Sequence, residues 1–213
     1  TTCAKRIGIQ LRILGLNPVL ISLDDYFVER EKTPRDEKGE YDYESLYALD
    51  LETFNDHLRT LFAGGSVDVP RYDFITGTRE YHETPLQLDE RSVLVIEGIH
   101  ALNPELTKDI DDSFKFKIYI SALTSISLDY ISRIATTDNR LLRRTVRDYS
   151  TRGSDAAATL KRWGSVRNGE DKHIFPYQEN ADVMFNSSLF YEISVLKRFV
   201  EPMLHEVPYT VPE

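Results

Sequence analysis

Acidic side chains directly follow two apolar segments of this chain. Asp24 and Asp25 come at the end of the run 19–23, and Glu97 follows the run 93–96. Short runs rich in β-branched residues are typical of strands that are buried on both faces. In an open parallel sheet, ligands bind at the carboxyl ends of the strands. The sequence therefore predicts that acids from two strand ends face the same crevice.

A cluster of arginines lies later in the chain, in the window 133–152. This window holds no lysine and two acids, Asp138 and Asp148, although the whole chain has a net charge of −9. A guanidinium presents a planar fork of donors that suits phosphate oxygens. One interpretation is a solvated helix face with internal ion pairs; the exclusive use of arginine favours the other, an anion-binding helix. The arginines are Arg133, Arg140, Arg143, Arg144, Arg147 and Arg152.

Strands and helices alternate along the chain and must position these side chains. Strands are expected at 19–23, 93–96, 114–123 and 181–188, and helical patterns cover 2–14, 46–62, 125–134 and 190–204. Alternation of this kind predicts a parallel sheet in a doubly wound α/β fold. The segment 67–88 differs, because it reads as a β-hairpin around Thr76-Gly77-Thr78 that is inserted before the next strand.

Length and composition limit the classes of protein that are compatible with this chain. Its 213 residues, 41% hydrophobic and 29% charged, predict one globular domain over 1–213. No apolar run approaches the roughly 18 residues of a membrane span, and the acidic balance disfavours binding to DNA. A single cysteine, Cys3, excludes an internal disulfide and favours the reducing cytoplasm. The histidines lack the spacing of a zinc site. The oligomeric state stays open, with a homo-oligomer allowed.

Acids at two strand ends and an arginine-rich helix suit phosphoryl transfer. That reaction needs a magnesium site, a group that orients the acceptor hydroxyl, and cations around the transferred phosphate. A phosphate loop of the form G-x-x-x-x-G-K-[ST] would complete the set, and it is followed by a helix. The chain begins Thr1-Thr2 and runs directly into a helical pattern. If the loop precedes Thr1, the hydroxyl of Thr1 would be a magnesium ligand. Alternatively, the two threonines only cap a helix.

Six segments stand in a recognisable order: "TTCAKRIGIQLRILG", "ISLDDYF", "VPRYDFITGTRE", "VLVIEGIHAL", "NRLLRRTVRDYSTRG" and "ENADVMFNSS". They resemble the helix after the phosphate loop, the catalytic strand end, the substrate hairpin, the Walker B-like strand, the arginine-rich lid and the late strand of the uridine kinase family. This family belongs to the phosphoribulokinase/uridine kinase group of P-loop kinases. The resemblance runs from Thr1 to about Leu204, and it is strongest to a longer bacterial form with a TGS-like and synthetase-like N-terminal region.

The resemblance implies a fold and a set of cofactors. The fold is a P-loop NTPase-like doubly wound parallel sheet with the inserted hairpin at 67–88 and an arginine-rich helical lid at 133–165. The first strand and the phosphate loop would precede Thr1 and are absent from the chain. The cofactors are ATP and Mg²⁺, with Thr1 and Glu97 as metal ligands. The residues implied at the ATP site are Thr1, Thr2, Arg143 and Arg147.

The resemblance also assigns catalytic and acceptor roles. Asp24 matches the aspartate that accepts the proton of a nucleoside 5′-hydroxyl, whereas Asp25 falls where the family varies and is interpreted as a strand-end cap. The lid arginines Arg147 and Arg152 are assigned to catalysis. The residues implied at the acceptor site are Tyr43 and Glu44 for the sugar, Tyr72 near the base, and Arg144 and Arg162.

Two positions depart from the pattern of uridine–cytidine kinases. The hairpin of those enzymes carries a histidine that reads the base, and the matching residue here is Gly77. A later glutamine aligns with Arg162. Since glycine has no side chain to read a base, we expect modest discrimination between pyrimidine and purine nucleosides. Strong pyrimidine selectivity would direct attention to Arg79 and His82.

Three functional hypotheses follow. The first is an ATP-dependent nucleoside kinase. The second is a kinase of another small hydroxyl substrate, such as a sugar phosphate, in which Arg162 and Arg167 bind the acceptor phosphate. The third is a non-catalytic nucleotide-binding regulatory domain, which would have no need of Asp24, Glu97 and the lid arginines together.

Overall fold

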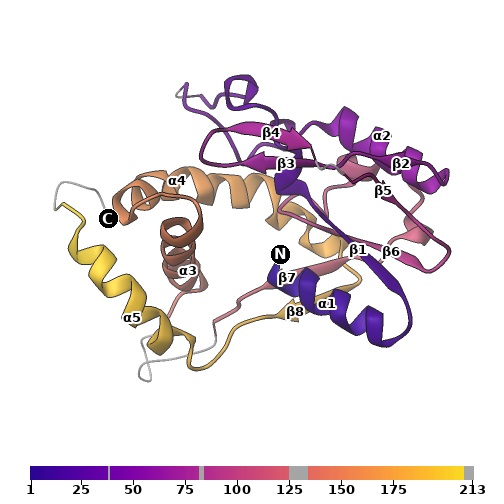
Figure 1. Cartoon of the computed structure of the whole chain (residues 1–213). Coiled ribbons are helices and arrows are strands. Elements are labelled where there is room, and N and C mark those ends of the chain that lie inside the picture. The colour runs from indigo at the N-terminus through magenta and orange to yellow at the C-terminus, as the bar shows by residue number, and fades with distance from the viewer. Residues whose placement is uncertain (38, 82–83, 125–133, 209–213) are drawn as a thin grey trace. The chain divides into compact units, whose positions relative to one another are not determined.

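A computed structural model describes residues 1–37, 39–81, 84–124 and 134–208 of the chain. They form two compact units (Figure 1). The first unit comprises 1–115 and 169–177, and the second comprises 116–168 and 178–213. No helix among the described residues is long and apolar enough to cross a membrane.

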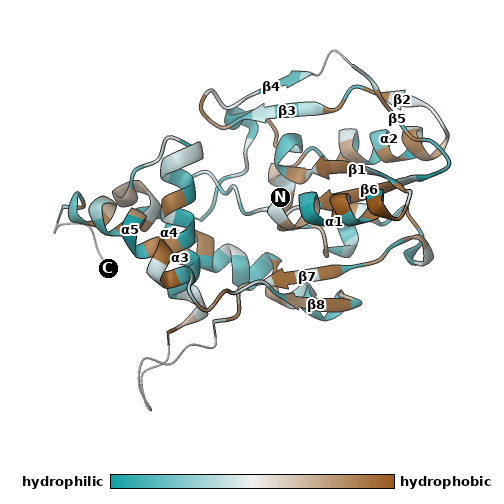
Figure 2. Cartoon of the chain, turned by 60° about the horizontal axis from the view of Figure 1, so that its bottom comes forward, coloured by the Kyte–Doolittle hydropathy of each residue, from teal (hydrophilic) through white to brown (hydrophobic). Residues whose placement is uncertain are grey.

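The first unit contains a parallel strand pair that carries the predicted acids. Strand β1 (Asn17–Ser22) pairs with β6 (Ser92–Glu97) in parallel, and the register runs from Asn17 opposite Ser92 to Ser22 opposite Glu97. Both strands are largely hydrophobic (Figure 2). Because the two strands end side by side, the predicted meeting of the two strand ends at one edge is confirmed.

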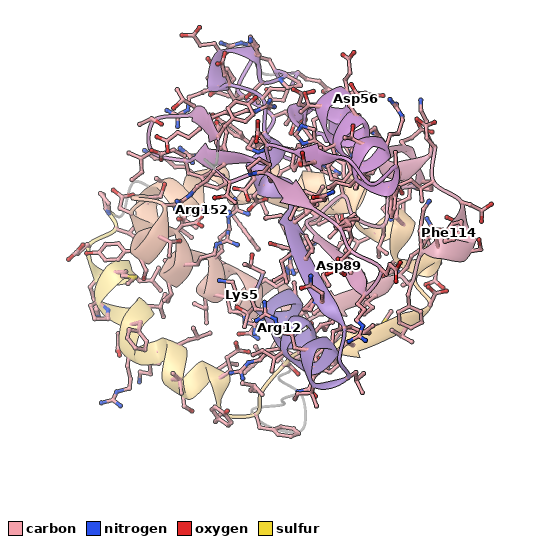
Figure 3. All side chains as sticks on the ribbon, turned by 45° about the vertical axis from the view of Figure 1, so that its right-hand side comes forward. Lys5, Arg12, Asp56, Asp89, Phe114 and Arg152 are labelled. Atoms are coloured by element: carbon pink, nitrogen blue, oxygen red, sulfur yellow. The ribbon has the colours of Figure 1, made fainter. Side chains whose placement is uncertain are left out.

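The helix expected at 2–14 is present as α1 (Thr2–Ile13), and it packs on β1. A side chain at Gly8 would lie 3.2 Å from Leu20, so a glycine allows the helix to approach the strand closely. Basic side chains such as Lys5 and Arg12 project from this helix (Figure 3).

Helix α2 (Leu51–Phe62) lies on the hydrophobic core of the first unit. Its buried Phe54, Leu58 and Leu61 belong to the same cluster as Ile21 and Leu23, the residues at the end of β1 and just beyond it. Burial of such side chains contributes roughly 1.5–3 kcal/mol each. The α2 helix therefore fixes the position of the segment that follows β1.

The continuous helix expected over 46–62 is divided in two. A 3-10 turn, η3 (Leu46–Ala48), precedes α2, and Asp50 caps α2 by accepting a hydrogen bond from the Thr53 N–H at 3.0 Å. An N-cap residue has non-helical backbone angles, so the cap ends the turn and begins a new helix.

The inserted hairpin of the sequence prediction is present. Strand β3 (Pro70–Asp73) pairs antiparallel with β4 (Thr78–Tyr81), and Gly77 in their turn has a φ of 78°. A second antiparallel pair joins β2 (Ser66–Val67) to β5 (Leu86–Gln87).

Short 3-10 turns complete the connections in the first unit. Two of them follow β1, namely η1 (Leu23–Tyr26), which carries Asp24 and Asp25, and η2 (Arg30–Lys32). Two more follow β6, namely η4 (Pro104–Thr107) and η5 (Asp112–Phe114).

The second unit contains a parallel strand pair and the arginine-rich helix. Strand β7 (Ile118–Ser121) pairs with β8 (Val183–Asn186), which confirms both late strands. The helices are α3 (Thr136–Thr151), α4 (Ala156–His173) and α5 (Glu192–His205), with a 3-10 segment η6 (Phe175–Asn180). The last residues of α4 and the first of η6 belong to the first unit. The helix expected at 125–134 and Arg133 lie outside the described residues, except for Ile134.

Candidate active site

Glu97, Thr1 and Ser22 form a cluster of oxygen atoms at the carboxyl end of the β1–β6 pair. The Thr1 hydroxyl donates to Glu97 Oε1 at 2.7 Å, and the Ser22 hydroxyl donates to the same oxygen at 2.9 Å. The Thr1 amino group lies 2.8 Å from Glu97 Oε2. The structure therefore brings together Thr1 and Glu97, the two residues that the sequence suggests as magnesium ligands.

Ser22 is a member of this cluster that sequence reasoning missed. It is the last residue of β1 and stands directly opposite Glu97 in the parallel register. The signal was available in principle, because two strands of equal length that end together place their last residues side by side. Because both last residues, Ser22 and Glu97, are polar, their contact could then have been suggested.

The Glu97 carboxyl group is held in its ionised form. Burial by itself would raise its pKa, but hydrogen bonds from the Thr1 amino and hydroxyl groups, with a smaller contribution from Ser22, hold the pKa below its usual value. The group is therefore a carboxylate at neutral pH.

These residues fit a magnesium ion. Mg²⁺ prefers oxygen ligands and commonly binds through one or two carboxylates together with substrate phosphates. One carboxylate and two hydroxyls match that donor set. Within the described ranges, no group of three or more His, Cys, Asp or Glu side chains gathers to form a metal site.

Gly98 allows the turn with Asp24 to pack against the end of β6. A side chain at this position would lie 2.6 Å from Leu23 Cβ and 2.8 Å from Leu23 Cδ1. Any larger residue would push η1 away from the strand end. Glycine is therefore required for the close approach of the segment that carries Asp24 to the segment that carries Glu97.

Asp24 and Asp25 are both half-buried in η1, but their surroundings differ. Asp25 Oδ1 accepts a hydrogen bond from the backbone N–H of Tyr72, at 3.4 Å. This contact connects Asp25 to the hairpin and is compatible with a structural role. The catalytic role of Asp24 stays a prediction.

Tyr72 and Tyr43, both expected at the acceptor site, belong to one aromatic cluster. The Phe27 ring lies 5.6 Å from the Tyr72 ring, 6.0 Å from the Phe74 ring and 6.4 Å from the Tyr43 ring, and Tyr41 lies 6.0 Å from Tyr43. Phe27 and Tyr72 are buried in the core, whereas Phe74, Tyr43 and Tyr41 are half-buried, so these three rings are the ones that keep accessible surface. Such surface suits a planar ligand.

Glu44 is fixed by close packing against Gly169, a residue of α4 that belongs to the same unit. A side chain at Gly169 would lie 2.4 Å from Glu44 Cβ. His100 lies near the backbone of Glu44 and Ser45, and it is 2% exposed. Burial, together with the neighbouring His173, lowers the pKa of His100 to about 4, so the ring is neutral at physiological pH. Sequence reasoning missed this histidine.

Arg79 has a structural position in the hairpin. Its guanidinium donates to the carbonyl oxygens of Phe27 at 2.6 Å and Tyr26 at 3.1 Å, and to Asp50 Oδ2 at 2.9 Å. These bonds join β4 to the segment after β1 and to the cap of α2. Arg79 is therefore a poor candidate for reading a base, and His82 lies outside the described residues.

We expect Arg79→Met to lower the free energy of unfolding by about 2 kcal/mol, because it leaves two carbonyl groups and a carboxylate without their charged donor. Burial favours a higher pKa for Asp50, but the Thr53 N–H and Arg79 hold the pKa below its ordinary value. The stabilisation from this pair is therefore present above the ordinary pKa of an aspartate and is lost as the pH falls.

Denaturant titrations of wild type and variant at neutral and acidic pH test this expectation. The difference between the two proteins should shrink in acid. Arg71→Met is the matched control, since Arg71 is exposed on the adjacent strand of the same hairpin. Equal effects of the two substitutions would contradict the structural role of Arg79.

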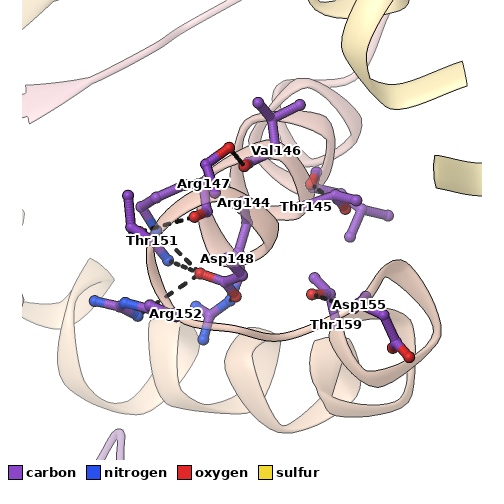
Figure 4. A network of polar contacts seen from close by, with 11 residues as sticks. Arg144, Thr145, Val146, Arg147, Asp148, Thr151, Arg152, Asp155 and Thr159 are labelled. Carbon is purple, nitrogen blue, oxygen red and sulfur yellow. Dashed lines mark hydrogen bonds and ion pairs between the residues drawn. The ribbon is translucent and has the colours of Figure 1, made fainter. Parts of the chain in front are cut away.

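The arginine-rich helix organises three guanidinium groups around one carboxylate (Figure 4). Asp148 is 6% exposed and accepts hydrogen bonds from Arg144 Nε at 3.2 Å and Arg147 Nη2 at 3.0 Å, and Arg152 Nη1 lies 3.8 Å from it. Arg144 and Arg152 are each four residues from Asp148, which is the spacing of neighbours on a helix face. The internal ion pairs of the solvated-face interpretation are thus present, and they hold Arg144, Arg147 and Arg152 together.

Arg143 does not join this group. It forms an ion pair with Glu192 at the start of α5, and Asn139 donates to the same carboxylate at 3.2 Å. This contact fastens α3 to α5. Arg162 lies exposed on α4, and Thr2 is the exposed first residue of α1. The roles predicted for Arg143, Arg162 and Thr2 stay predictions.

Parallel strands that end in a carboxylate–hydroxyl cluster, together with an inserted hairpin and an arginine-rich helix, define the class of α/β kinases. The phosphoribulokinase/uridine kinase family model matches residues 18–194, and the chain belongs to this family. Its members are kinases, so the chain is a phosphotransferase that acts on a hydroxyl group.

Similar proteins agree with this assignment. Uridine kinases of Staphylococcus aureus strains such as JH9 and Newman are 28% identical over 171 residues, which is 80% of this chain and 74% of theirs. A possible uridine kinase of Bacillus stearothermophilus has a similar solved structure, with a TM-score of 0.51, 22% identity, and coverage of 87% of this chain and 80% of that one. A protein provisionally assigned as a fructose transport system kinase of Silicibacter sp. TM1040 has a TM-score of 0.56 and 16% identity, covering 86% and 82%. These structures support the predicted fold class.

Proposed function

We propose that this protein transfers the γ-phosphoryl group of ATP to the 5′-hydroxyl of a nucleoside. The observation that carries the proposal is that two groups lie next to each other. One is the oxygen cluster of Glu97, Thr1 and Ser22, and the other is the η1 turn with Asp24, which Gly98 allows to pack against the end of β6. Kinase chemistry requires a metal position and an acceptor-orienting acid close to each other. The similarity to uridine kinases supports a nucleoside as the acceptor.

Each group has a role in this proposal. Asp24 orients the acceptor hydroxyl and accepts its proton. Thr1, Ser22 and Glu97 hold Mg²⁺, which, when bound with ATP, neutralises charge on the phosphates. Tyr43 and Glu44 bind the sugar, and the half-buried Phe74 ring, which packs on the buried Tyr72, stacks on the base.

The lid arginines complete the catalytic set. Asp148 holds the guanidinium groups of Arg144, Arg147 and Arg152 in one group, so they are ordered before they meet a ligand. Preorganised cations of this kind stabilise charge on a transferring phosphoryl group. We place the reaction in the cytoplasm, with a small molecule as the acceptor.

A substrate screen of the full-length protein tests the proposal, with ADP release as the readout in the presence and absence of Mg²⁺. The panel contains uridine, cytidine, inosine, adenosine and a set of sugar phosphates. Release stimulated by nucleosides supports the proposal. If only sugar phosphates stimulate ADP release, the acceptor is a sugar phosphate and not a nucleoside. Arg162 and Arg167 would then be examined as ligands of the acceptor phosphate. A protein that binds ATP but responds to no acceptor would be regulatory.

A further inference from the structure

The turn of the hairpin contains an arginine that lies over a glycine. Gly77 is buried and has a φ of 78°. A side chain at this position would lie 2.8 Å from Arg30 Cζ and 2.8 Å from Arg30 Nε. The guanidinium of Arg30 therefore occupies the space that any side chain at position 77 would need.

The backbone and side chain of Arg30 are both fixed to this turn. Its N–H donates to the Gly77 carbonyl at 3.1 Å, and Nη2 donates to the carbonyl oxygens of Phe74 at 2.8 Å and Ile75 at 3.4 Å. Nη2 thus anchors the group. A guanidinium has five N–H donors and no acceptor, so the anchored group has more donors than the two carbonyls and the Tyr72 hydroxyl use.

Arg30 faces the aromatic cluster. Burial raises the pKa of Tyr72, and the charge of Arg30 together with a hydrogen bond from Arg30 to the Tyr72 hydroxyl opposes that rise. Tyr72 in turn lies 5.2 Å from Phe74 and 5.6 Å from Phe27. Tyr72 and Phe27 are buried, whereas Phe74 is half-buried, so a planar ligand against the Phe74 ring would lie near the guanidinium that is bonded to the Phe74 carbonyl.

The guanidinium has no carboxylate counterpart. Arg30 forms no ion pair with the acids in the described part of the chain, whereas Arg79 on the same hairpin pairs with Asp50. A donor-only cation held at the edge of an aromatic surface, and not neutralised by the protein, is suited to a ligand that supplies acceptor atoms.

We propose that Arg30 is a specificity-determining residue that reads the base of the acceptor, and that it selects bases with an oxygen at pyrimidine C4 or purine C6 over bases with an amino group at that position. The inference rests on the proposed nucleoside kinase function. A keto oxygen accepts from the guanidinium, whereas an amino group presents a second donor to it and leaves both unpaired. The rule is independent of ring size, so it applies to uridine over cytidine and to inosine over adenosine.

The test uses these two matched pairs of nucleosides with the full-length protein. Binding is measured by calorimetry, and kcat and KM are measured by ADP release. Wild type should favour the keto member of each pair by about tenfold, the scale of one good contact to a base edge. Arg30→Met should abolish that preference in both pairs, mainly through KM of the keto member, with kcat at saturation little changed.

Matched controls separate recognition from folding. Arg71→Met removes one positive charge from an exposed position of the same hairpin and should leave the preference intact. Gly77→Ala should displace the guanidinium and reproduce the loss, and combining it with Arg30→Met should add little. Gly64→Ala reports the cost of backbone strain alone, because Gly64 has a φ of 82° and open space around it.

The outcomes distinguish the inference from the proposed function. If wild type phosphorylates nucleosides but treats the two members of each pair alike, the inference is wrong and the function stands. Equal weakening of both members in Arg30→Met would show that Arg30 only supports the hairpin. If wild type accepts no nucleoside, both the function and the inference fail. Should Arg30→Met not fold, Gly77→Ala carries the test.

Discussion

We expect Asp24→Asn to lower the turnover of the full-length protein by roughly 10²-fold or more, the range that a positioned acid–base group contributes. The asparagine keeps the shape of the side chain but cannot accept the proton of the acceptor hydroxyl. The affinity for ATP should change little, since Asp24 is assigned to the acceptor. Initial rates of ADP release at saturating substrate, together with a separate measurement of ATP binding, check both parts.

Asp25→Asn is the natural control for this experiment, because the two aspartates are adjacent in the same turn. Its Oδ1 accepts a hydrogen bond from the Tyr72 N–H, and an asparagine oxygen can accept the same bond. We therefore expect a much smaller loss of turnover. Equal losses at the two positions would contradict the assignment, and a loss at Asp25 alone would reverse it.

The parts of the site that depend on local pattern could be predicted from the sequence. Apolar runs identified the four strands β1, β6, β7 and β8, and the acids after β1 and at the end of β6 located Asp24 and Glu97. Parallel strand ends meet at one edge, and this physical rule is sufficient to bring the two segments together. The cap of α2 by Asp50 was also open to prediction, since aspartate before a helical pattern is a start signal.

The contacts that the sequence did not reveal are between residues far apart in the chain. Arg30 and the Phe74 carbonyl are separated by 44 residues, and Arg79 and the Tyr26 carbonyl by 53. Neither pair has a periodic signal, because each bond depends on how the hairpin folds back on the loop after β1. The local sequence does not distinguish an arginine with a structural role from an arginine that faces a ligand. The two are distinguished by the number and geometry of the hydrogen bonds that each guanidinium makes.

The same reasoning applies to the arginine-rich helix. The sequence presented ion pairing and anion binding as alternatives; the structure shows the ion pairs, and anion binding stays a prediction. Asp148 holds three arginines, two in α3 and Arg152 at its C-cap, and this reduces the conformational entropy that a ligand would have to remove on binding. Arg143, by contrast, joins two helices. The helix thus divides its arginines between a structural contact and a preorganised group.

Glu97→Gln should lower turnover by roughly 10²–10³-fold, comparable to the loss of one strong electrostatic contact in the transition state. The substitution preserves the size of the side chain and its ability to accept hydrogen bonds from Thr1 and Ser22. It removes the negative charge, which is the property that a divalent cation requires. The Mg²⁺ concentration needed for half-maximal turnover should therefore rise.

Protonation of Glu97 should have the same effect as Glu97→Gln, so the Mg²⁺ requirement should depend on pH. The Thr1 and Ser22 hydroxyls donate to the Glu97 carboxylate and favour its ionised form, so the Mg²⁺ requirement of wild type should be constant throughout the neutral range. It should increase only in acid, where the carboxylate becomes protonated. Titrations of turnover against Mg²⁺ at several pH values measure this dependence.

Two further variants identify what Glu97 contributes. Glu90→Gln makes the same chemical change at an exposed position just before β6 and should have no effect. Ser22→Ala removes one hydroxyl while the carboxylate remains, so we expect a smaller rise in the Mg²⁺ requirement than in Glu97→Gln. Unchanged turnover and an unchanged Mg²⁺ requirement in Glu97→Gln would show that the metal is held elsewhere. The cluster at the ends of β1 and β6 would then have a structural role only.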